Sequence, residues 1–344
     1  MLVNPGQLMK YLATALMMTL LWTLAPSVAI AVDEPLVVYS GRSDAFVRPA
    51  MARFTEKTGI EVVVHAGSAT ELVNKLRLEG RRTDADLFLS NDVGSLQLGA
   101  SHDLFQALPE ALLADIPDNY HDEAGQWTGL SARARVLVIN TQAEDLAEID
   151  SVFDLAREDL HGRIAVTNSA NESFVAGVTV YLEAAGEETT RAWLQGLRRN
   201  AEGSAYARHR QVVNDVASGR RDVGLVNHYY VARHLDQAPD APLRMVVPDQ
   251  GEGQIGVAWN VSGVAVSRHS RRPEAALKLV EFLVSDQGQE IFAGANREYP
   301  VRPGVAEAEG LPSADGMRVA DVPMSLLGPR RTRAVDLIEA VGMP

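Results

Sequence analysis

The sequence predicts an α/β protein with two lobes, each built around a parallel sheet. Three observations support this prediction: short β-rich runs alternate with helical patterns, the alternation restarts in the second half, and two long apolar segments lie between the halves. Such alternation is typical of parallel strands with helices on both faces of the sheet. A chain of 344 residues is long enough for two lobes of ordinary size.

In the first half, three apolar runs predict strands, over residues 36–41, 60–65 and 85–90. Helical spacing of apolar residues predicts a helix over 44–58, which Gly59 ends. A second helix is expected to begin after Ser68, because Ser68 and Glu71 fit a capping box, and to end at Gly80. This strand–helix–strand–helix–strand order forms the first lobe.

The pattern restarts after residue 160. Strands are predicted over residues 163–168 and 222–227, and helices over 172–186 and 210–219, with another helix beginning at the residues YYVARHL. A further helix is predicted over 271–285, where Pro273 suits the first turn.

Two long apolar segments, 129–140 and 253–267, are predicted to cross between the lobes as strands. Two strands that link two lobes form a hinge, which commonly allows domain closure around a ligand. The predicted division is a first lobe of residues 33–130 with 262–298 and a second lobe of 131–261 with 299–344.

Composition excludes several classes of function. The formal net charge of −13 and the pI near 5.1 argue against nucleic acid as a partner, because no basic surface is available to bind phosphates. The sequence contains no cysteine, which rules out disulfides, thiolate metal sites and cysteine nucleophiles. Any metal must therefore be bound by oxygen and nitrogen ligands.

The first 31 residues are predicted to be a secretory signal peptide. Lys10 precedes an apolar run, and Ala29-Ile30-Ala31 resembles a cleavage site. The alternative is an uncleaved membrane anchor, but the apolar core is shorter than the roughly 20 residues that a membrane span requires. The sequence therefore indicates an exported protein.

Tyr229 and Tyr230 stand just after the strand predicted over 222–227. Ligands of open α/β sheets lie beyond the carboxyl ends of the strands, and a strand-to-helix turn lets two consecutive side chains converge. Phenolates are hard oxygen donors that suit Fe³⁺. Ionising one phenol at neutral pH requires roughly 4 kcal/mol, which a nearby trivalent cation can supply. The alternative is that both phenols stay neutral and pack in a crevice wall.

Two further groups of polar residues are candidates for the same cleft. The segment TNSANES, residues 167–173, precedes a predicted helix, whose N-terminus can bind an anion, although Ser169 and Asn171 would also serve as ordinary caps. Arg133 and Arg135 fall on one face of the first crossover strand, so both can face the cleft. The alternative is a surface ion pair.

Several ordered motifs resemble those of the periplasmic ferric-iron-binding proteins, the iron(III) solute-binding components of ABC transporters. They are VVYSGR (37–42), ADLFLSND (85–92), GLSARARVLVIN (129–140), DVGLVNHYY (222–230) and NREYPV (296–301). The resemblance covers nearly the whole mature chain. It implies a type II periplasmic-binding-protein fold, with two α/β lobes joined by hinge crossover strands.

The resemblance also implies a function. A monomer in the periplasm would capture Fe³⁺ in the interlobe cleft and deliver it to an ABC transporter permease in the inner membrane for iron uptake. Such a protein is not an enzyme, and the sequence agrees, because it contains no G-x-S-x-G motif, P-loop or defensible Ser/His/Asp arrangement. The alternative is the same scaffold with another small solute, such as an organic or phosphorylated anion, thiamine or a polyamine.

The family's paired iron-ligating tyrosines match Tyr229 and Tyr230. Its other ligand positions fall where this chain has different residues, at Ser43, Asp44, Asn91 and Ser173, with Asp92 and Glu172 beside two of them. The residues that match the family's site for a synergistic anion such as carbonate or phosphate are Ser169, Ala170, Asn171 and Asn227. Arg133 and Arg135 match cleft arginines that offset phenolate charge. Asp44, Asp92, Glu172, water or an exogenous anion would complete the iron coordination.

Overall fold

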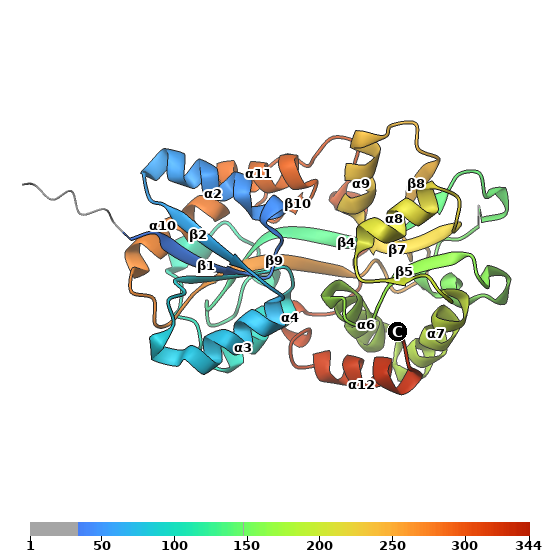
Figure 1. Cartoon of the computed structure of the whole chain (residues 1–344), viewed down its shortest axis with the longest axis horizontal. Helices are drawn as coiled ribbons and strands as arrows, with labels where there is room; N and C mark the ends of the chain where they lie inside the picture. Colours follow the sequence, from blue (N-terminus) through green and yellow to red (C-terminus); the bar gives the residue numbers. More distant parts are fainter. Residues whose placement is uncertain (1–33, 147) are drawn as a thin grey trace, which may run out of the picture. The chain divides into compact units, whose positions relative to one another are not determined.

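The computed structural model describes residues 34–146 and 148–344 (Figure 1). The predicted signal peptide, residues 1–31, lies outside the described residues. Residues Pro35–Pro344 form one unit, and it has the two-lobed α/β architecture that the sequence predicts. None of the helices within the described range is long and apolar enough to cross a membrane.

The sheet follows the order β2-β1-β3-β9-β4-β7-β5-β6, with β8 and β10 also paired to β4. Its strands are β1 Leu36–Ser40, β2 Val62–Ala66, β3 Leu87–Ser90, β4 Thr128–Asn140, β5 Ile164–Thr167, β6 Ala205–Tyr206, β7 Val223–Asn227, β8 Leu243–Val246, β9 Trp259–Val266 and β10 Tyr299–Pro300.

Each lobe contains parallel strands, and two long antiparallel strands connect the lobes. In the first lobe β1 is parallel to β2 and β3, and in the second β5 is parallel to β6 and β7. Strand β4 pairs with β9 in the middle, while β9 also pairs with β3 and β4 with β7. The predicted crossover strands are therefore confirmed. However, the second strand begins at Trp259 rather than residue 253, because Gly253 and Gly256 adopt left-handed φ values of 77° and 84°.

Helices cover both faces of the sheet in each lobe (Figure 1). Around β1 and β2, helices α2, α10 and α11 lie on one side and α3 and α4 on the other. Around β5 and β7, α8 and α9 lie opposite α6, α7 and α12. Their bounds are α2 Asp44–Thr58, α3 Ala69–Glu79, α4 Val93–Ser101, α5 Glu110–Leu113, α6 Glu172–Ala185, α7 Glu187–Asn200, α8 His209–Ala217, α9 His228–Gln237, α10 Pro273–Val284, α11 Asp286–Asn296 and α12 Arg331–Val341.

Local signals in the sequence correctly mark several helix ends. Ser68 caps α3 in a reciprocal capping box with Glu71, and Gly59 ends α2 in the left-handed conformation, with φ at 74°. Pro273 occupies the first turn of α10. These caps fix where each helix begins or ends relative to the strands, and so position the loops at the carboxyl ends of the strands.

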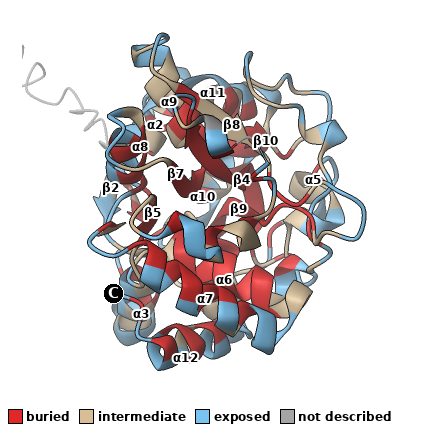
Figure 2. Cartoon of the chain, turned by 90° about the vertical axis from the view of Figure 1, so that its right-hand side faces the viewer, coloured by how far each residue is buried: buried red, intermediate tan, exposed pale blue. Residues whose placement is uncertain are grey.

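The sheet is buried where the two lobes meet. Every residue of β4 and of β9 is buried, and Figure 2 shows β4, β7 and β9 in the buried interior, behind α6 and α7. The apolar core runs continuously through both lobes. Burial on both faces accounts for the long apolar runs that identify these strands in the sequence.

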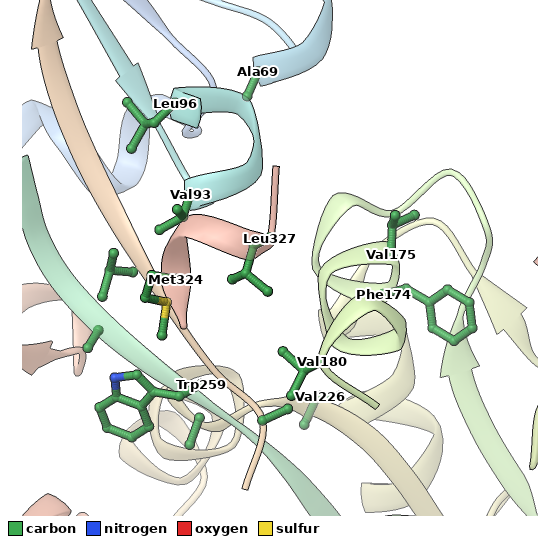
Figure 3. Close-up of a cluster of buried hydrophobic side chains, with 14 of the residues drawn as sticks. Ala69, Val93, Leu96, Phe174, Val175, Val180, Val226, Trp259, Met324 and Leu327 are labelled. Carbon is green, nitrogen blue, oxygen red and sulfur yellow. The ribbon is translucent and has the colours of Figure 1, made fainter. Parts of the chain in front are cut away.

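The chain after β10 forms a third connection between the lobes. Val319 pairs with Val257 beside the second lobe, and the 3₁₀ helix Met324–Leu326 packs against α4 of the first lobe. Helix α12 then returns to pack on α6 and α7. Figure 3 shows Met324 and Leu327 between Val93 of α4 and Val180 of α6. The sequence reading did not anticipate α12 or this connection.

A buried ion pair joins the first lobe to both crossover strands. The Arg42 guanidinium donates to both carboxylate oxygens of Glu298 at 2.6 Å, and both side chains are almost fully buried. The same guanidinium donates to Ser262 of β9 at 2.7 Å and to Ser131 of β4 at 3.3 Å. Ser131 donates in turn to Glu298 at 3.0 Å. This network fixes the loop after β1 against the hinge.

Replacing Glu298 by Ala is expected to lower the free energy of unfolding by about 3 kcal/mol, because it leaves the Arg42 cation buried without a partner. The measurement is urea denaturation at neutral pH. Glu290→Ala is the control, because it removes an exposed carboxylate from α11, the helix that precedes Glu298. It should change stability by less than about 0.5 kcal/mol. Equal small effects for both variants would refute a structural role for the ion pair.

Candidate metal centre

The two tyrosines lie at the junction of β7 and α9. Asn227 ends β7 in an extended conformation, with φ −78° and ψ 139°, and α9 begins at His228. The rings of Tyr229 and Tyr230 lie side by side, with centroids 4.6 Å apart and planes inclined by 39°. The change from strand to helix thus brings two consecutive phenols together, as the sequence predicts.

Asn227 holds Tyr229 in place. Its side-chain amide donates to the Tyr229 hydroxyl at 3.0 Å and to the Ser173 hydroxyl of α6 at 3.2 Å. Its carbonyl oxygen accepts from the Arg135 guanidinium at 3.1 Å. Since all of these groups are buried, Asn227 links the crossover strand, the start of α6 and the first phenol in one network.

Two rings from other elements enclose the tyrosine pair. The His209 ring lies 4.8 Å from the Tyr230 ring, and Phe46 of α2 packs edge-on against Tyr229 and Tyr230 at 5.4 and 6.2 Å. Burial raises the pKa of the Tyr230 phenol well above its usual value, and the adjacent Tyr229 phenol raises it further. Without a cation nearby, Tyr230 therefore remains neutral at physiological pH.

The His228 ring packs edge-on against the Tyr229 ring, with centroids 5.4 Å apart. One ring nitrogen contacts the Arg297 carbonyl oxygen at 2.8 Å, and the other accepts from the Ala134 backbone N–H at 3.3 Å. The ring also stacks on Tyr299 at 4.4 Å. Burial lowers the pKa of His228 to about 4. His228 is thus a neutral structural residue that anchors the start of α9 to β4.

Arg133 and Arg135 line a small cavity behind the tyrosine pair. Both are at least nine-tenths buried, and neither forms an ion pair within the described residues. The cavity has a volume of about 10 Å³, comparable with the space that one water needs. Arg133 Nη2, Arg135 Nε and Asn260 Nδ2 have no hydrogen-bond partner. The two arginines are therefore buried around this cavity rather than paired with carboxylates at the surface, and their role in ligand binding stays a prediction.

The loop before α6 forms a helix cap and hydrogen bonds to two distant segments of the chain. The Asn171 side chain caps α6 by accepting from the Phe174 N–H at 3.2 Å and donates to the Ala207 carbonyl at 3.1 Å. The Ser169 N–H donates to the Pro344 carbonyl at 2.6 Å, and Ala170 is exposed. The capping interpretation of Asn171 is confirmed, and anion contact by this loop stays a prediction.

The candidate ligands of the first lobe have other partners. Ser43 is exposed at the start of α2, and Asp44 forms a surface ion pair with Arg48. Asp92 is buried and caps α4, accepting from the Gly94 N–H at 2.7 Å and the Ser95 hydroxyl at 3.1 Å. In the described part of the chain, no three His, Asp or Glu side chains cluster so that they could hold a metal ion.

Asn91 and Glu172 meet at the cleft. The Glu172 carboxylate accepts from the Thr70 backbone N–H at 3.2 Å and the Thr70 hydroxyl at 3.4 Å. Burial raises the pKa of Glu172, and the nearby Asn91 side chain acts in the opposite direction. The sequence analysis did not identify Phe46, which packs on the tyrosine pair, although its place in the first turn of the helix after β1 could have indicated it. It also did not identify Asn260, which lines the cavity and has no distinctive sequence signal.

Two lobes, a hinge of long strands and a phenol pair in the cleft define a solute-binding protein. The family model for bacterial extracellular solute-binding proteins matches residues 36–295, and the chain belongs to that family. This match covers most of the chain that the structure describes.

Similar proteins of known name indicate a narrower class within the solute-binding proteins. The chain is 31% identical to iron uptake protein A1 of Synechocystis sp., over 90% of this chain and 88% of that protein. It is also 31% identical to the Fe(3+)-binding periplasmic protein of Serratia marcescens, over 81% and 82% of the two chains. A Trichodesmium IdiA (FutA) structure in complex with iron and citrate ligands is 29% identical and aligns with a TM-score of 0.76, over 90% and 100%. These similarities confirm the resemblance to ferric-iron-binding proteins.

Replacing Arg133 by Met is expected to raise the free energy of unfolding of the metal-free protein by about 1–3 kcal/mol, because it removes a buried cation that has no partner. Urea denaturation without metal measures the effect. Arg157→Met, which removes a surface ion pair with Asp159, is the control and should change stability by about 0.5 kcal/mol or less. A loss of stability in Arg133→Met would show that its charge is compensated in the metal-free protein.

Proposed function

We propose that this protein captures Fe³⁺ between Tyr229 and Tyr230 and delivers it to an ABC permease for iron uptake. The observation that carries the proposal is the pairing of two adjacent phenols with two buried guanidiniums that have no carboxylate partner. Such a site lacks negative charge when both phenols are protonated. Deprotonating the phenols on binding a trivalent cation would supply that charge.

An exogenous anion completes the coordination in this proposal. Two phenolates would balance Arg133 and Arg135, so the charge of the ion itself must be met by further anionic ligands. The side of the first lobe that covers the pair presents Phe46, which offers no ligand atom. The hydroxyl of Ser173, Asn227 and the unpaired arginine donors would hold carbonate, phosphate or a citrate-like carboxylate beside the iron once the cavity, which has space for about one water in this structure, widens. The citrate in the Trichodesmium structure supports a carboxylate ligand.

The site disfavours the alternative cationic solutes. Thiamine or a polyamine would add positive charge beside two unpaired guanidiniums, and unlike a trivalent metal ion neither would ionise the two phenols to offset that charge. An organic or phosphorylated anion could satisfy the guanidiniums, but it would leave the tyrosine pair without a specific role. Ferric iron with an accompanying anion accounts for both groups.

Delivery depends on closure of the lobes. A ligand shifts the equilibrium between open and closed forms only by its preference for one of them, and an ion held between the lobes favours the closed form. We infer that the mature protein is a periplasmic monomer that presents this closed form to a permease in the inner membrane. The periplasmic relative from Serratia marcescens supports this location, and because the relatives are binding proteins we expect no catalysis.

Adding ferric citrate to the purified protein is expected to produce a visible tyrosinate-to-iron charge-transfer band, with one iron per chain by elemental analysis. The double variant Tyr229→Phe, Tyr230→Phe should abolish the band and leave the fold intact. Tyr206→Phe removes a phenol elsewhere in the second lobe, one that hydrogen-bonds to Asp215, and should keep the band. An unchanged spectrum of the wild-type protein at neutral pH, with carbonate present, would contradict the proposal, as would a band that survives in the double variant.

A further inference from the structure

Consecutive side chains at the start of α6 contact the metal centre and the first lobe. Ser173 accepts from the Asn227 amide at 3.2 Å, and the same amide donates to the Tyr229 hydroxyl at 3.0 Å. Glu172, one residue earlier, accepts from the Thr70 backbone N–H at 3.2 Å and from the Thr70 hydroxyl at 3.4 Å. One turn of α6 thus connects the tyrosine pair of the second lobe to α3 of the first.

Both hydrogen bonds that the Glu172 carboxylate accepts come from Thr70 of α3. Thr70 is the second residue of α3, where backbone N–H groups are free and the helix dipole favours a negative charge. Burial and the nearby Asp92 carboxylate raise the pKa of Glu172, whereas the Thr70 N–H, the Arg331 charge and the Asn91 side chain favour its ionised form. Thr70 and Asn91 belong to the first lobe, and Arg331 begins α12.

The first-lobe partner of Glu172 is rigidly placed. A Cβ at Gly41 would lie 2.5 Å from the Cβ of Ala69, so the end of β1 packs directly against the residue before Thr70. At α4, a Cβ at Gly328 would lie 2.4 Å from the Cβ of Gln97. Figure 3 shows Leu327 in this region between α4 and α6. The Thr70 N–H is therefore a fixed donor for a side chain that crosses from the second lobe.

We propose that Glu172 is an interlobe latch: a positioning residue that holds the lobes closed through Thr70 and is not a ligand of the metal. The inference rests on the proposed function, because the cleft that it closes is the iron site. Opening the cleft must break the Glu172–Thr70 contact, so the latch slows loss of the metal. The Ser173–Asn227 contact holds the same end of α6 at a fixed position relative to Tyr229. Binding of the metal at Tyr229 is therefore coupled to closure of the lobes.

Two variants test the latch in the mature protein. Glu172→Ala removes the acceptor and is expected to release iron to excess EDTA about tenfold faster, with the charge-transfer band at the wild-type position. Iron-loaded Glu172→Ala should also show a larger radius of gyration in X-ray scattering. Glu172→Gln retains an oxygen that can accept from the Thr70 N–H, so its release rate should lie between those of wild type and Glu172→Ala. Glu187→Ala, on α7 of the same lobe, is the matched control and should behave as wild type.

Other outcomes would overturn the latch. A displaced band in both Glu172 variants would identify Glu172 as a metal ligand, and unchanged release rate and radius would show that the Thr70 contact does not govern closure. If the wild-type protein shows no band, the proposed function fails, but scattering without metal still tests the latch. In that measurement Glu172→Ala must be more open than both wild type and Glu187→Ala; equal radii would refute the latch independently of iron.

Discussion

The hydrogen bond from Arg135 to Asn227 joins the main crossover strand to the tyrosine pair, and the rest of the site depends on it. Asn227 has its carbonyl oxygen engaged by the guanidinium, so its amide must turn toward Tyr229 and Ser173. Burying two guanidiniums without carboxylates costs stability. Arg133 and Arg135 therefore place uncompensated positive charge beside the two phenols. The phenols can offset this charge only as phenolates, and these form only when a cation binds.

The hinge strands hold the two arginines and the tyrosine pair in fixed positions. Arg42 and Glu298 bind Ser131 and Ser262, so the first lobe is tied to the middle of both crossover strands. On the other side, His228 accepts from the Ala134 N–H of β4 and sets where α9 begins. The tyrosine pair therefore keeps its place relative to the hinge, while α3 and α6 contact each other through the Glu172 carboxylate and Thr70. Rigid placement of the site and a breakable contact across the cleft are both needed for reversible capture.

Much of this could be predicted from the sequence, because its signals are local. The strand ending at Asn227, the capping box at Ser68 and the one-face spacing of Arg133 and Arg135 depend on neighbours in the chain. The contacts of Phe46 with the tyrosines and of Glu172 with Thr70 could not be predicted, because they join residues far apart in the sequence. Helix α12 was missed for a similar reason: its position is set by packing on α6 and α7 rather than by a distinctive motif.

The central claim is that both phenols ionise because a trivalent cation binds between the lobes. Counting the protons released when ferric nitrilotriacetate loads the protein in weakly buffered, bicarbonate-free solution at pH 7 tests it most directly, once the protons taken up by the freed chelator and by the hydroxide bound to the ferric chelate have been measured separately. The account predicts about two protons per bound iron for the wild-type protein and about one for a variant with a single tyrosine replaced by Phe. Stoichiometric iron uptake with no proton release would mean that the phenols stay neutral, and it would contradict the account.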